Sequence, residues 1–256
     1  MKTMRITFLG TGTSGGVPVI NCDCPVCTSA NPKNKRLRSS VMVEVGAKYI
    51  LIDTSVDMRQ QFLRTPFPRI DAVLFTHAHA DHIFGLDEIR RFNHLQKQRI
   101  PIYGSQETID RLRVIFTHAF SQGPLRPGVP NVAAHVVDGP FNIGHIAITP
   151  VPLLHGDLPI FGYRIGNFAY LTDVSKIPKS SYDLLNNLDL LVLDTLRVRP
   201  HPTHFHLDQA LIEAAKIAAR QTYLIHMNHN IDHEEHSRLL PEGVHFSYDG
   251  LVLELD

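Results

Sequence analysis

The feature that most constrains the fold is the heptapeptide Thr-His-Ala-His-Ala-Asp-His at residues 76–82, directly after an apolar run at 72–75. An apolar run of this length is typical of a buried strand. A strand that ends in ligand-type side chains presents them together at one edge of a sheet. Imidazole nitrogen and carboxylate oxygen suit zinc, manganese or iron. The heptapeptide therefore predicts a metal site at the end of a buried strand, with four candidate ligands: His77, His79, Asp81 and His82.

The spacing divides these four residues into two pairs. His77 and His79 are two residues apart, so they point to the same side of an extended chain. Asp81 and His82 follow where the chain is expected to turn into a helix, so each pair is predicted to hold a different metal. Solvated loop histidines are the alternative, and the density of ligand-type residues behind a buried strand argues against it.

Three later residues of the same type also follow β-type runs. Taken alone, each is as well explained by a structural polar role, and for a lone histidine that role is the more common one. Their succession at predicted strand ends favours a shared site: His155 after the run 146–151, Asp173 after 168–171 and His226 after 222–225.

The heptapeptide and the three later residues resemble, in order, the metal-binding pattern of the metallo-β-lactamase superfamily, and the resemblance extends over nearly the whole chain. It implies an α/β (α+β) fold, the four-layer αββα sandwich, in a single domain of residues 1–256. It also implies seven ligands in two sets that share one carboxylate: His77, His79 and His155 for one metal, Asp81, His82 and His226 for the other, and Asp173 bridging them.

Composition narrows the classes of function. The 256 residues suffice for one large domain or two small ones, and a hydrophobic content of 43% supports a sizeable core. The 25 basic and 25 acidic residues cancel, so no overall charge favours nucleic acid or an anionic membrane. Sixteen histidines fit a metal enzyme.

The compartment is inferred from apolar patterning and cysteine use. No apolar stretch is long enough for a membrane span, and no secretory apolar segment follows the basic start. The three cysteines all lie within 22–27, which argues against a disulfide framework. We therefore expect a cytoplasmic protein without membrane association.

Short β-type runs alternate with helical patterns along the chain, without a repeat of 20–50 residues. Periodicity alone indicates α/β or α+β, with two packed sheets flanked by helices. The Gly/Pro-rich segment 121–130 is interpreted as a surface loop, with a lid over the site as the alternative. Strands are expected at 6–9, 41–45, 49–52, 72–75, 134–137, 146–149, 161–165, 168–171, 190–193, 223–225 and 251–255, and helices at 57–63, 86–94, 107–115, 180–186 and 207–219.

A second metal site is predicted at about 22–27, where Cys22, Cys24 and Cys27 have the Cys-x-Cys-x-x-Cys spacing of a zinc knuckle. Three thiolates do not close a structural site, so buried or redox-active thiols are the alternative. His229, three residues beyond His226, is the expected fourth ligand, and His233 and His236 stay open as rivals.

The Gly-rich segment 10–18, the cysteine cluster and the heptapeptide together resemble the branch of the phosphoribosyl 1,2-cyclic phosphate phosphodiesterases, which belongs to the carbon–phosphorus lyase pathway. The resemblance implies a structural zinc on Cys22, Cys24, Cys27 and His229. Coenzyme-biosynthesis relatives of the pyrroloquinoline quinone pathway share the knuckle, so the individual substrate stays open. Segment 10–15 lacks the spacing and lysine of a P-loop and is interpreted as a tight turn near the metals.

The resemblance also places a general acid at His204, just before a predicted helix. An imidazole, with an ordinary pKa of about 6.5, can carry a proton at neutral pH and still release it. His206 is the rival, and polar residues at a helix start are the alternative for both. Asp81 is expected to help orient the proton transfer while remaining a ligand. Upstream of His204 lie three basic residues that either bind a substrate phosphate or form a solvated basic loop: Arg197, Arg199 and His201.

The leading hypothesis is a metal-dependent phosphodiesterase that acts on a small-molecule phosphodiester with two active-site metals (zinc or manganese, or iron) and one structural zinc. Hydrolysis of a lactone or thioester is the alternative reaction, because one fold supports many chemistries. A non-catalytic metal-binding module is disfavoured because every ligand position is filled. Neutral charge argues against a tRNA-processing ribonuclease. The oligomeric state stays open between a monomer and a homodimer.

Overall fold

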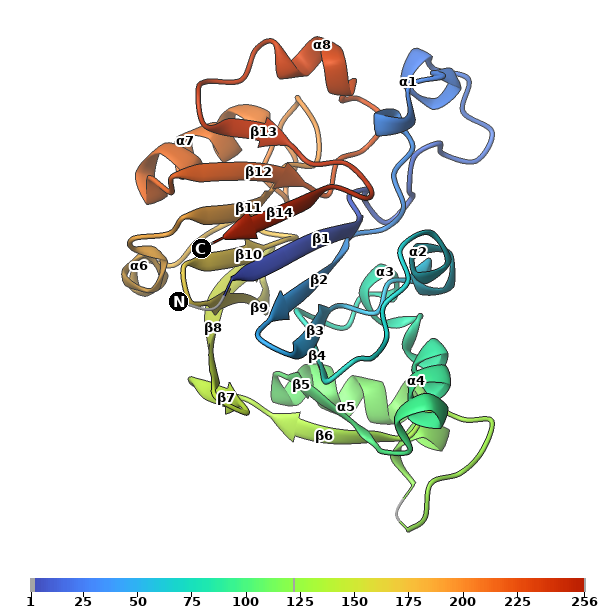
Figure 1. Ribbon diagram of the computed structural model, residues 1–256. Helices are drawn as coiled ribbons and strands as arrows, with labels where there is room; N and C mark the ends of the chain where they lie inside the picture. Colours follow the sequence, from blue (N-terminus) through green and yellow to red (C-terminus); the bar gives the residue numbers. More distant parts are fainter. Residues whose placement is uncertain (1–2, 122, 256) are drawn as a thin grey trace. The chain divides into compact units, whose positions relative to one another are not determined.

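The computed structural model of the chain describes residues 3–121 and 123–255, which fall into two compact units, each built on one seven-stranded sheet (Figure 1). Unit 1 contains the described residues of Met1–Gly10, Ser40–Asp138 and Gly250–Asp256. Unit 2 contains Thr11–Ser39 and Gly139–Asp249. The chain thus passes repeatedly between the units, so each unit joins segments that are distant in sequence.

The sheet of unit 1 has the strand order β14-β1-β2-β3-β4-β5-β6, antiparallel from β14 to β3 and parallel from β3 to β6. Its strands are β1 (Met4–Gly10), β2 (Ser40–Val45), β3 (Lys48–Ile52), β4 (Ala72–Leu74), β5 (Ile100–Gly104), β6 (Val132–Val136) and β14 (Val252–Leu255). Its helices are α2 (Met58–Arg64), α3 (Ala80–Ile83), α4 (Ile89–Gln96) and α5 (Gln106–Ile115), with 3₁₀ turns η2 (Leu86–Glu88) and η3 (Thr117–Phe120).

Strand β4 is the apolar run that precedes the heptapeptide. It lies between the parallel strands β3 and β5, and all of its residues are buried, as expected for a central strand covered on both faces. On one face, Leu51, Val73 and Ile102 of these strands pack against apolar side chains of the helices, including Met58, Ile89, Phe92, Ile109 and Leu112. The end of β4, where the heptapeptide begins, is therefore anchored in a packed core.

The sheet of unit 2 has the order β13-β12-β11-β10-β9-β8-β7, antiparallel from β7 to β10 and parallel from β10 to β13. Its strands are β7 (Phe141–Ile143), β8 (Ile146–His155), β9 (Leu158–Ile165), β10 (Phe168–Leu171), β11 (Leu190–Asp194), β12 (Gln221–Ile225) and β13 (Val244–Phe246). Its helices are α1 (Pro25–Thr28), α6 (Lys179–Tyr182), α7 (Leu207–Ile217) and α8 (His233–Ser237), with 3₁₀ turns η1 (Pro32–Asn34) and η4 (Asp183–Leu185).

The parallel strands of unit 2 bring three chain segments to one edge of the sheet. Leu171 of β10 is paired with Leu193 of β11, and Leu193 with Leu224 of β12. Because these strands run in the same direction, the residues that follow them lie side by side at their carboxyl ends. The apolar face of α7 packs against this sheet through Leu207, Ala210, Ala214 and Ile217.

The expected elements are found, with differences at their boundaries. The helix expected at 207–219 ends at Ile217, because Ala218 adopts a left-handed conformation. Strands β7 and β13 were not expected; both are three residues long and lie at the edges of their sheet, where short strands carry little periodic signal. Within the described ranges, no helix has both the length and the apolar character that a membrane span needs.

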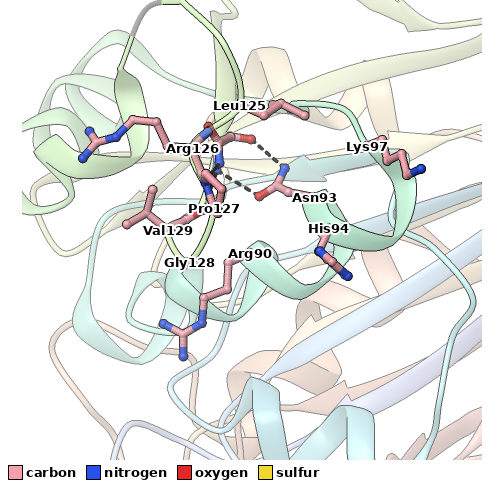
Figure 2. A pocket seen from close by; sticks show the side chains of 10 residues that line it. Arg90, Asn93, His94, Lys97, Leu125, Arg126, Pro127, Gly128 and Val129 are labelled. Atoms are coloured by element: carbon pink, nitrogen blue, oxygen red, sulfur yellow. Dashed lines mark hydrogen bonds between the residues drawn. The ribbon is translucent and has the colours of Figure 1, made fainter.

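The Gly/Pro-rich segment 121–130, of which Gln122 lies outside the described residues, leads into an anchored turn on α4 (Figure 2). The Asn131 backbone N–H donates to Asn93 Oδ1 at 2.9 Å, and Asn93 Nδ2 donates to the Asn131 carbonyl at 2.8 Å. Asn131 in turn accepts a hydrogen bond from the Arg126 backbone N–H. These contacts hold the loop against a helix of its own unit, which agrees with the surface-loop interpretation.

Candidate metal centres

The heptapeptide forms a compact cluster in unit 1, here called the β4 cluster: His77, His79, Asp81 and His82. The ring centroid of His77 lies 4.5 Å from that of His79 and 4.3 Å from that of His82. Asp81 Oδ2 lies 3.3 Å from His82 Nε2. Helix α3 begins at Ala80, as the expected turn into a helix requires. All four predicted ligands of this segment are thus gathered at the end of β4.

Asp53 supports the β4 cluster from the end of β3. Its fully buried carboxylate accepts hydrogen bonds from the Thr76 backbone N–H at 2.9 Å and the Thr76 hydroxyl at 2.8 Å. Asp53 Oδ2 also lies 2.7 Å from His82 Nδ1, which directs His82 Nε2 toward Asp81. Burial raises the pKa of Asp53, and the neighbouring His82 opposes this. Asp53 is not among the residues predicted from the sequence, although it follows a strand as Asp173 does.

The later predicted residues form a second cluster in unit 2, here called the strand-end cluster: His155, Asp173, His204 and His226. His226 Nε2 lies 3.3 Å from Asp173 Oδ1. The His204 ring stacks on that of His226 with centroids 4.9 Å apart and meets that of His155 at 4.5 Å. The possible ligand atoms of His155, Asp173 and His204 all lie within 4.8 Å of one another.

Asp194 supports the strand-end cluster from the end of β11. It is fully buried, and Oδ2 lies 3.2 Å from His204 Nδ1 while Oδ1 lies 3.5 Å from His226 Nδ1. Its oxygens also accept the backbone N–H groups of Asp173 and Phe205. One carboxylate therefore orients two imidazoles and ties two strand ends together. Asp194 is not among the residues predicted from the sequence, although it follows an apolar run as the predicted ligands do.

Backbone conformation marks the same strand ends. Asp53, Asp173 and His226 have φ values of 62°, 57° and 67°, in the left-handed region that residues other than glycine seldom occupy. Such conformations cost on the order of 1–3 kcal/mol each and persist where the surrounding structure over-determines them. Here the buried hydrogen bonds of Asp53 and Asp194 hold the backbone in these conformations.

His201 lies beside the strand-end cluster, with its ring centroid 5.2 Å from that of His204. Its Nδ1 accepts the Thr203 backbone N–H at 3.3 Å. Burial lowers the pKa of His201, and the nearby His204 and Arg197 lower it further. His206, the rival general acid, is the N-cap residue of α7, and its backbone pairs with Arg197. Among the described residues, His204 and not His206 joins the candidate ligand groups.

The three cysteines surround one imidazole nitrogen in unit 2. The sulfurs of Cys22, Cys24 and Cys27 lie 3.2, 3.6 and 3.6 Å from His229 Nδ1. Tetrahedral zinc, with bonds of about 2.3 Å to sulfur and about 2.0 Å to nitrogen, places these atoms roughly 3.5 Å apart. One lone pair cannot accept three S–H groups, so the arrangement fits a zinc tetrahedron better than a hydrogen-bond network.

The rivals of His229 are engaged elsewhere. The His233 ring packs against Phe246 and Tyr248, and His236 Nδ1 lies 3.1 Å from the Asp232 carbonyl. Of the three histidines, the structure brings only His229 to the described sulfurs.

The thiols differ in acidity. The Cys27 backbone N–H lowers the pKa of Cys24, whereas burial raises the pKa of Cys27 to about 11. A metal bound at this site would therefore have to displace the proton of Cys27.

A family model matches the part of the chain that contains both clusters. Residues 48–227 match the model of the β-lactamase superfamily domain. The chain belongs to the metallo-β-lactamase superfamily. The predictions of family and fold class are confirmed, since the chain has two mixed sheets with flanking helices and resembles solved structures of this superfamily over its whole length. The superfamily fold also implies that the chain binds divalent metal.

One solved structure is a new diphosphatase from the PhnP family. It is 43% identical to this chain, with a TM-score of 0.93, and the match covers 99% of this chain and 97% of that one. Zinc-bound PqqB from Methylobacterium extorquens is 20% identical, with a TM-score of 0.79 over 98% of this chain and 100% of that one, and shows the shared fold. The family match and the likeness to the diphosphatase support a hydrolase of the superfamily.

A relative named octanoyltransferase, from Porphyromonas gingivalis (strain ATCC BAA-308 / W83), is 38% identical over 258 residues. The match covers 99% of this chain but 52% of the relative, so the chain spans about half the length of that protein.

Within this superfamily member, a buried arginine links the cysteine knuckle to the strand-end cluster. Arg36, with 1% of its surface exposed, donates to the carbonyls of Asn228 at 2.9 Å and Ile231 at 2.8 Å. These carbonyls flank His229 in the segment that begins at His226. Burial lowers the pKa of Arg36 to about 10. Arg36 is not among the residues predicted from the sequence, since an arginine close to lysines is usually exposed to solvent.

The Gly-rich segment lies against the same stretch. The Met227 backbone N–H donates to the Thr11 carbonyl at 3.0 Å, and that of Thr13 donates to the Met227 carbonyl at 3.3 Å. A Cβ at Gly12 would lie 2.9 Å from the Arg36 carbonyl oxygen, so only glycine fits there without a shift. This agrees with the interpretation as a tight turn near the metals, not a P-loop.

Proposed function

We propose that the chain is a dinuclear metal-dependent phosphodiesterase, a phosphoric diester hydrolase that acts on a small cyclic or linear phosphodiester such as phosphoribosyl 1,2-cyclic phosphate. The observation that carries the proposal is the Asp194–His204 pair beside Asp173 and His226. A buried carboxylate holding an imidazole next to metal-type ligands is the arrangement that delivers a proton to a leaving alkoxide. The likeness to a PhnP-family diphosphatase supports this reaction class.

The proposed metal ligands are the seven residues of the superfamily pattern. One set would bind the first divalent metal and the other set the second, with either zinc, manganese or iron compatible with these donors. When bound, such metals acidify water enough to supply hydroxide near neutral pH and offset the charge of a phosphodiester. The assignment is His77, His79 and His155 for one metal, Asp81, His82 and His226 for the other, and Asp173 for both.

His204 is the proposed general acid. With Nδ1 directed at Asp194, 3.2 Å away, its Nε2 is the atom that presents a proton to the leaving oxygen. The carboxylate then stabilises the proton on the ring until transfer, as in other carboxylate–histidine pairs. Asp81, whose Oδ2 lies 3.3 Å from His82 Nε2, is proposed both as a ligand and as a residue that orients this transfer.

A structural zinc is proposed on Cys22, Cys24, Cys27 and His229. It would tie the loop around α1 to the segment that starts at His226, so that the zinc and Arg36 hold the same segment from two sides. The sulfur–nitrogen distances of 3.2–3.6 Å support this assignment. Its role would be to position a ligand of the active-site metals.

Acyl-ester or thioester hydrolysis is the second candidate. The specific observation in its favour is the 38% identical relative named octanoyltransferase, which this chain matches over 99% of its own length. Because the chain spans only 52% of that protein, the acyl chemistry of the relative stays a proposal for this chain.

A substrate comparison tests the two candidates. The metal-reconstituted protein is assayed on bis(p-nitrophenyl) phosphate, an octanoyl thioester and a lactone, with Asp173→Asn as a matched inactive control. We expect turnover of the phosphodiester to exceed that of both acyl substrates, and to be lost in the control. Preferential turnover of the thioester, absent in the control, would replace the phosphodiesterase proposal with the acyl one.

A further inference from the structure

Two helices of unit 1 line a cavity of about 420 Å³ whose lining contains no candidate metal ligand. Residues of α2 and of the turn after it form one wall, and residues of α4 form the other. Arg59 and Leu63 on α2 are four residues apart, as are Arg91 and Leu95 on α4. Residues at this spacing lie on one face of a helix, so each helix turns a single face to the cavity.

The floor of the cavity is aromatic and is formed by packed side chains. The ring centroid of Phe62 lies 5.6 Å from that of Phe67 and 5.2 Å from that of Phe92, in both cases edge to face. This arrangement favours defined ring positions. Phe92 and Met58, which also line the cavity, belong to the buried core of unit 1. The apolar floor therefore exists without a ligand.

The rim of the cavity exposes one leucine on each wall. Leu63 on α2 is 64% exposed, and Leu95 on α4 is 50% exposed. A single exposed leucine is common, but exposed apolar side chains that continue an apolar cavity and are bordered by charged residues are typical of a binding surface. A ligand with an apolar body would remove both leucines from water.

The charged residues of the lining favour an anion. They are Arg59, Glu88 and Arg91. Glu88 has a cation of its own outside the lining, since its Oε1 lies 4.0 Å from an Nη of Arg90. Neither Arg59 nor Arg91 forms a hydrogen bond or an ion pair with any residue that the structure describes. Their guanidinium groups are therefore available, and a guanidinium can bind a carboxylate through two parallel N–H donors.

We propose that this cavity binds a medium-chain aliphatic carboxylate, with the chain against the aromatic floor and the two leucines and the carboxylate at Arg59 and Arg91. The occupant is the free acid. A volume of about 420 Å³ lies in the lower part of the range of small-molecule pockets, about 300–1,000 Å³, which suits one chain better than a two-chain lipid. The site goes beyond the proposed hydrolysis, and no bond is made or broken there.

A chain-length series tests the apolar part of the site. Calorimetry on the metal-replete protein compares acetate, hexanoate, octanoate and decanoate, below the concentrations at which they form micelles. We expect the affinity to rise by up to about fourfold for each added CH₂ group, the value for full burial, and to level off once the cavity is filled. Acetate, which has the carboxylate but no chain, reports any carboxylate that binds at the metals.

Substitutions in the lining separate the two parts of the site. We expect Arg59→Ala and Arg91→Ala each to weaken octanoate binding by about 10-fold, because each removes a charged donor, and to leave the binding of neutral 1-octanol unchanged. Leu63→Ser and Leu95→Ser should weaken the binding of both compounds. These leucines are exposed, so their substitution leaves the core of the unit intact.

Matched controls come from α5 of the same unit. Arg111→Ala and Val114→Ser change an exposed arginine and a valine that is 70% exposed, both outside the cavity lining. Neither should change the affinity for octanoate. Methyl NMR then locates the ligand, since decanoate should shift the methyl signals of Leu63 and Leu95 and leave those of Val114 in place.

Four outcomes would overturn the site. Acetate that binds as tightly as octanoate would place the carboxylate at the metals. 1-Octanol that binds as tightly as octanoate would remove the two arginines from the site. Absence of binding by every carboxylate of the series would exclude the ligand class. Binding to phosphatidylglycerol vesicles without binding of free octanoate would show a membrane surface in place of a carboxylate site.

Discussion

The β4 cluster and the strand-end cluster contain similar side chains but are assembled in opposite ways. In unit 1, four candidate ligands follow one strand within six residues, so local sequence alone gathers them. In unit 2, His155, Asp173 and His226 come from three different strands, and only the register of β10, β11 and β12 places two of them side by side. The comparison shows that candidate ligands can be gathered either by local sequence or by the topology of a sheet.

Both clusters nevertheless use the same support. Asp53 and Asp194 each end a strand, are fully buried, and direct an imidazole through its Nδ1 atom. Asp53 orients one histidine, whereas Asp194 contacts both His204 and His226. The assembled cluster therefore depends on one carboxylate more heavily than the local cluster does.

Removal of a ligand from either cluster should have the largest effect. We expect His79→Ala and His226→Ala each to lower phosphodiester turnover by more than about 100-fold, since changing residues that merely orient ligands already costs 10–100-fold. Metal analysis should show less bound metal in both variants. His94→Ala and His245→Ala, at exposed histidines of the two units, are the controls. A variant with full metal content and full activity would remove that residue from the ligand set.

Loss of the general acid should depend on the leaving group. We expect His204→Ala to slow hydrolysis of a diester with a ribose-like leaving group by about 10²–10⁴-fold. Bis(p-nitrophenyl) phosphate, whose nitrophenolate leaves without protonation, should be affected much less. Metal content should not change, and His206→Ala serves as the matched control. Equal losses on both substrates, or lost metal, would mean that His204 binds or coordinates instead.

The two supporting carboxylates test the comparison directly. We expect Asp53→Asn and Asp194→Asn each to lower turnover by about 10–100-fold, because the amide cannot hold the imidazole in the same way. Asp194→Asn should have the larger effect, since it serves two histidines and the His204 proton. Kinetics with ribose-like and nitrophenyl leaving groups measure this, and only Asp194→Asn should distinguish the two. An equal response of the two variants would show that the clusters are supported alike.

The cysteine knuckle should affect stability more than chemistry. We expect Cys24→Ser to remove one zinc per chain and to lower the free energy of unfolding by more than the roughly 0.5–3 kcal/mol of ordinary substitutions. Metal analysis and thermal unfolding measure both, with the exposed Asp23→Asn in the same loop as control. Unchanged zinc stoichiometry would exclude the site.

The smallest expected effect is a change in the free energy of unfolding at a residue with strained backbone and no catalytic role. Ala218, exposed at the end of α7, has φ of 53°, so Ala218→Gly should raise the free energy of unfolding by about 1 kcal/mol. Urea unfolding measures this, and activity should not change. The same relief is not expected at Asp173 or His226, where glycine would also remove buried contacts. A destabilised Ala218→Gly would show that the left-handed turn is not strained.

The sequence predicts most of the fold and the candidate site because both depend on short-range patterns. Apolar runs mark the central strands, and the heptapeptide and the cysteine knuckle are contiguous motifs. The later candidate ligands were predicted through the superfamily resemblance, since a lone histidine after a strand, such as His226, carries little signal by itself.

The residues that were missed act only through the folded structure. Asp53, Asp194 and Arg36 resemble ordinary strand-end or loop charges in the sequence. Their function depends on full burial and on partners far away in the chain, such as the carbonyls of Asn228 and Ile231 for Arg36. No local pattern predicts that a charged side chain will be buried, because its burial depends on which distant segments pack over it.

The pairing of β1 with β14 has a consequence for synthesis on the ribosome. Met4 and Arg5 pair with Leu255 and Glu254, so one side of β1 pairs with a strand that is synthesised after all the other described strands. Until residues 252–255 emerge, the outer edge of β1 presents unpaired backbone groups, which are a template for association with other chains. A nascent chain stalled before this segment should therefore be more prone to aggregate than a released one.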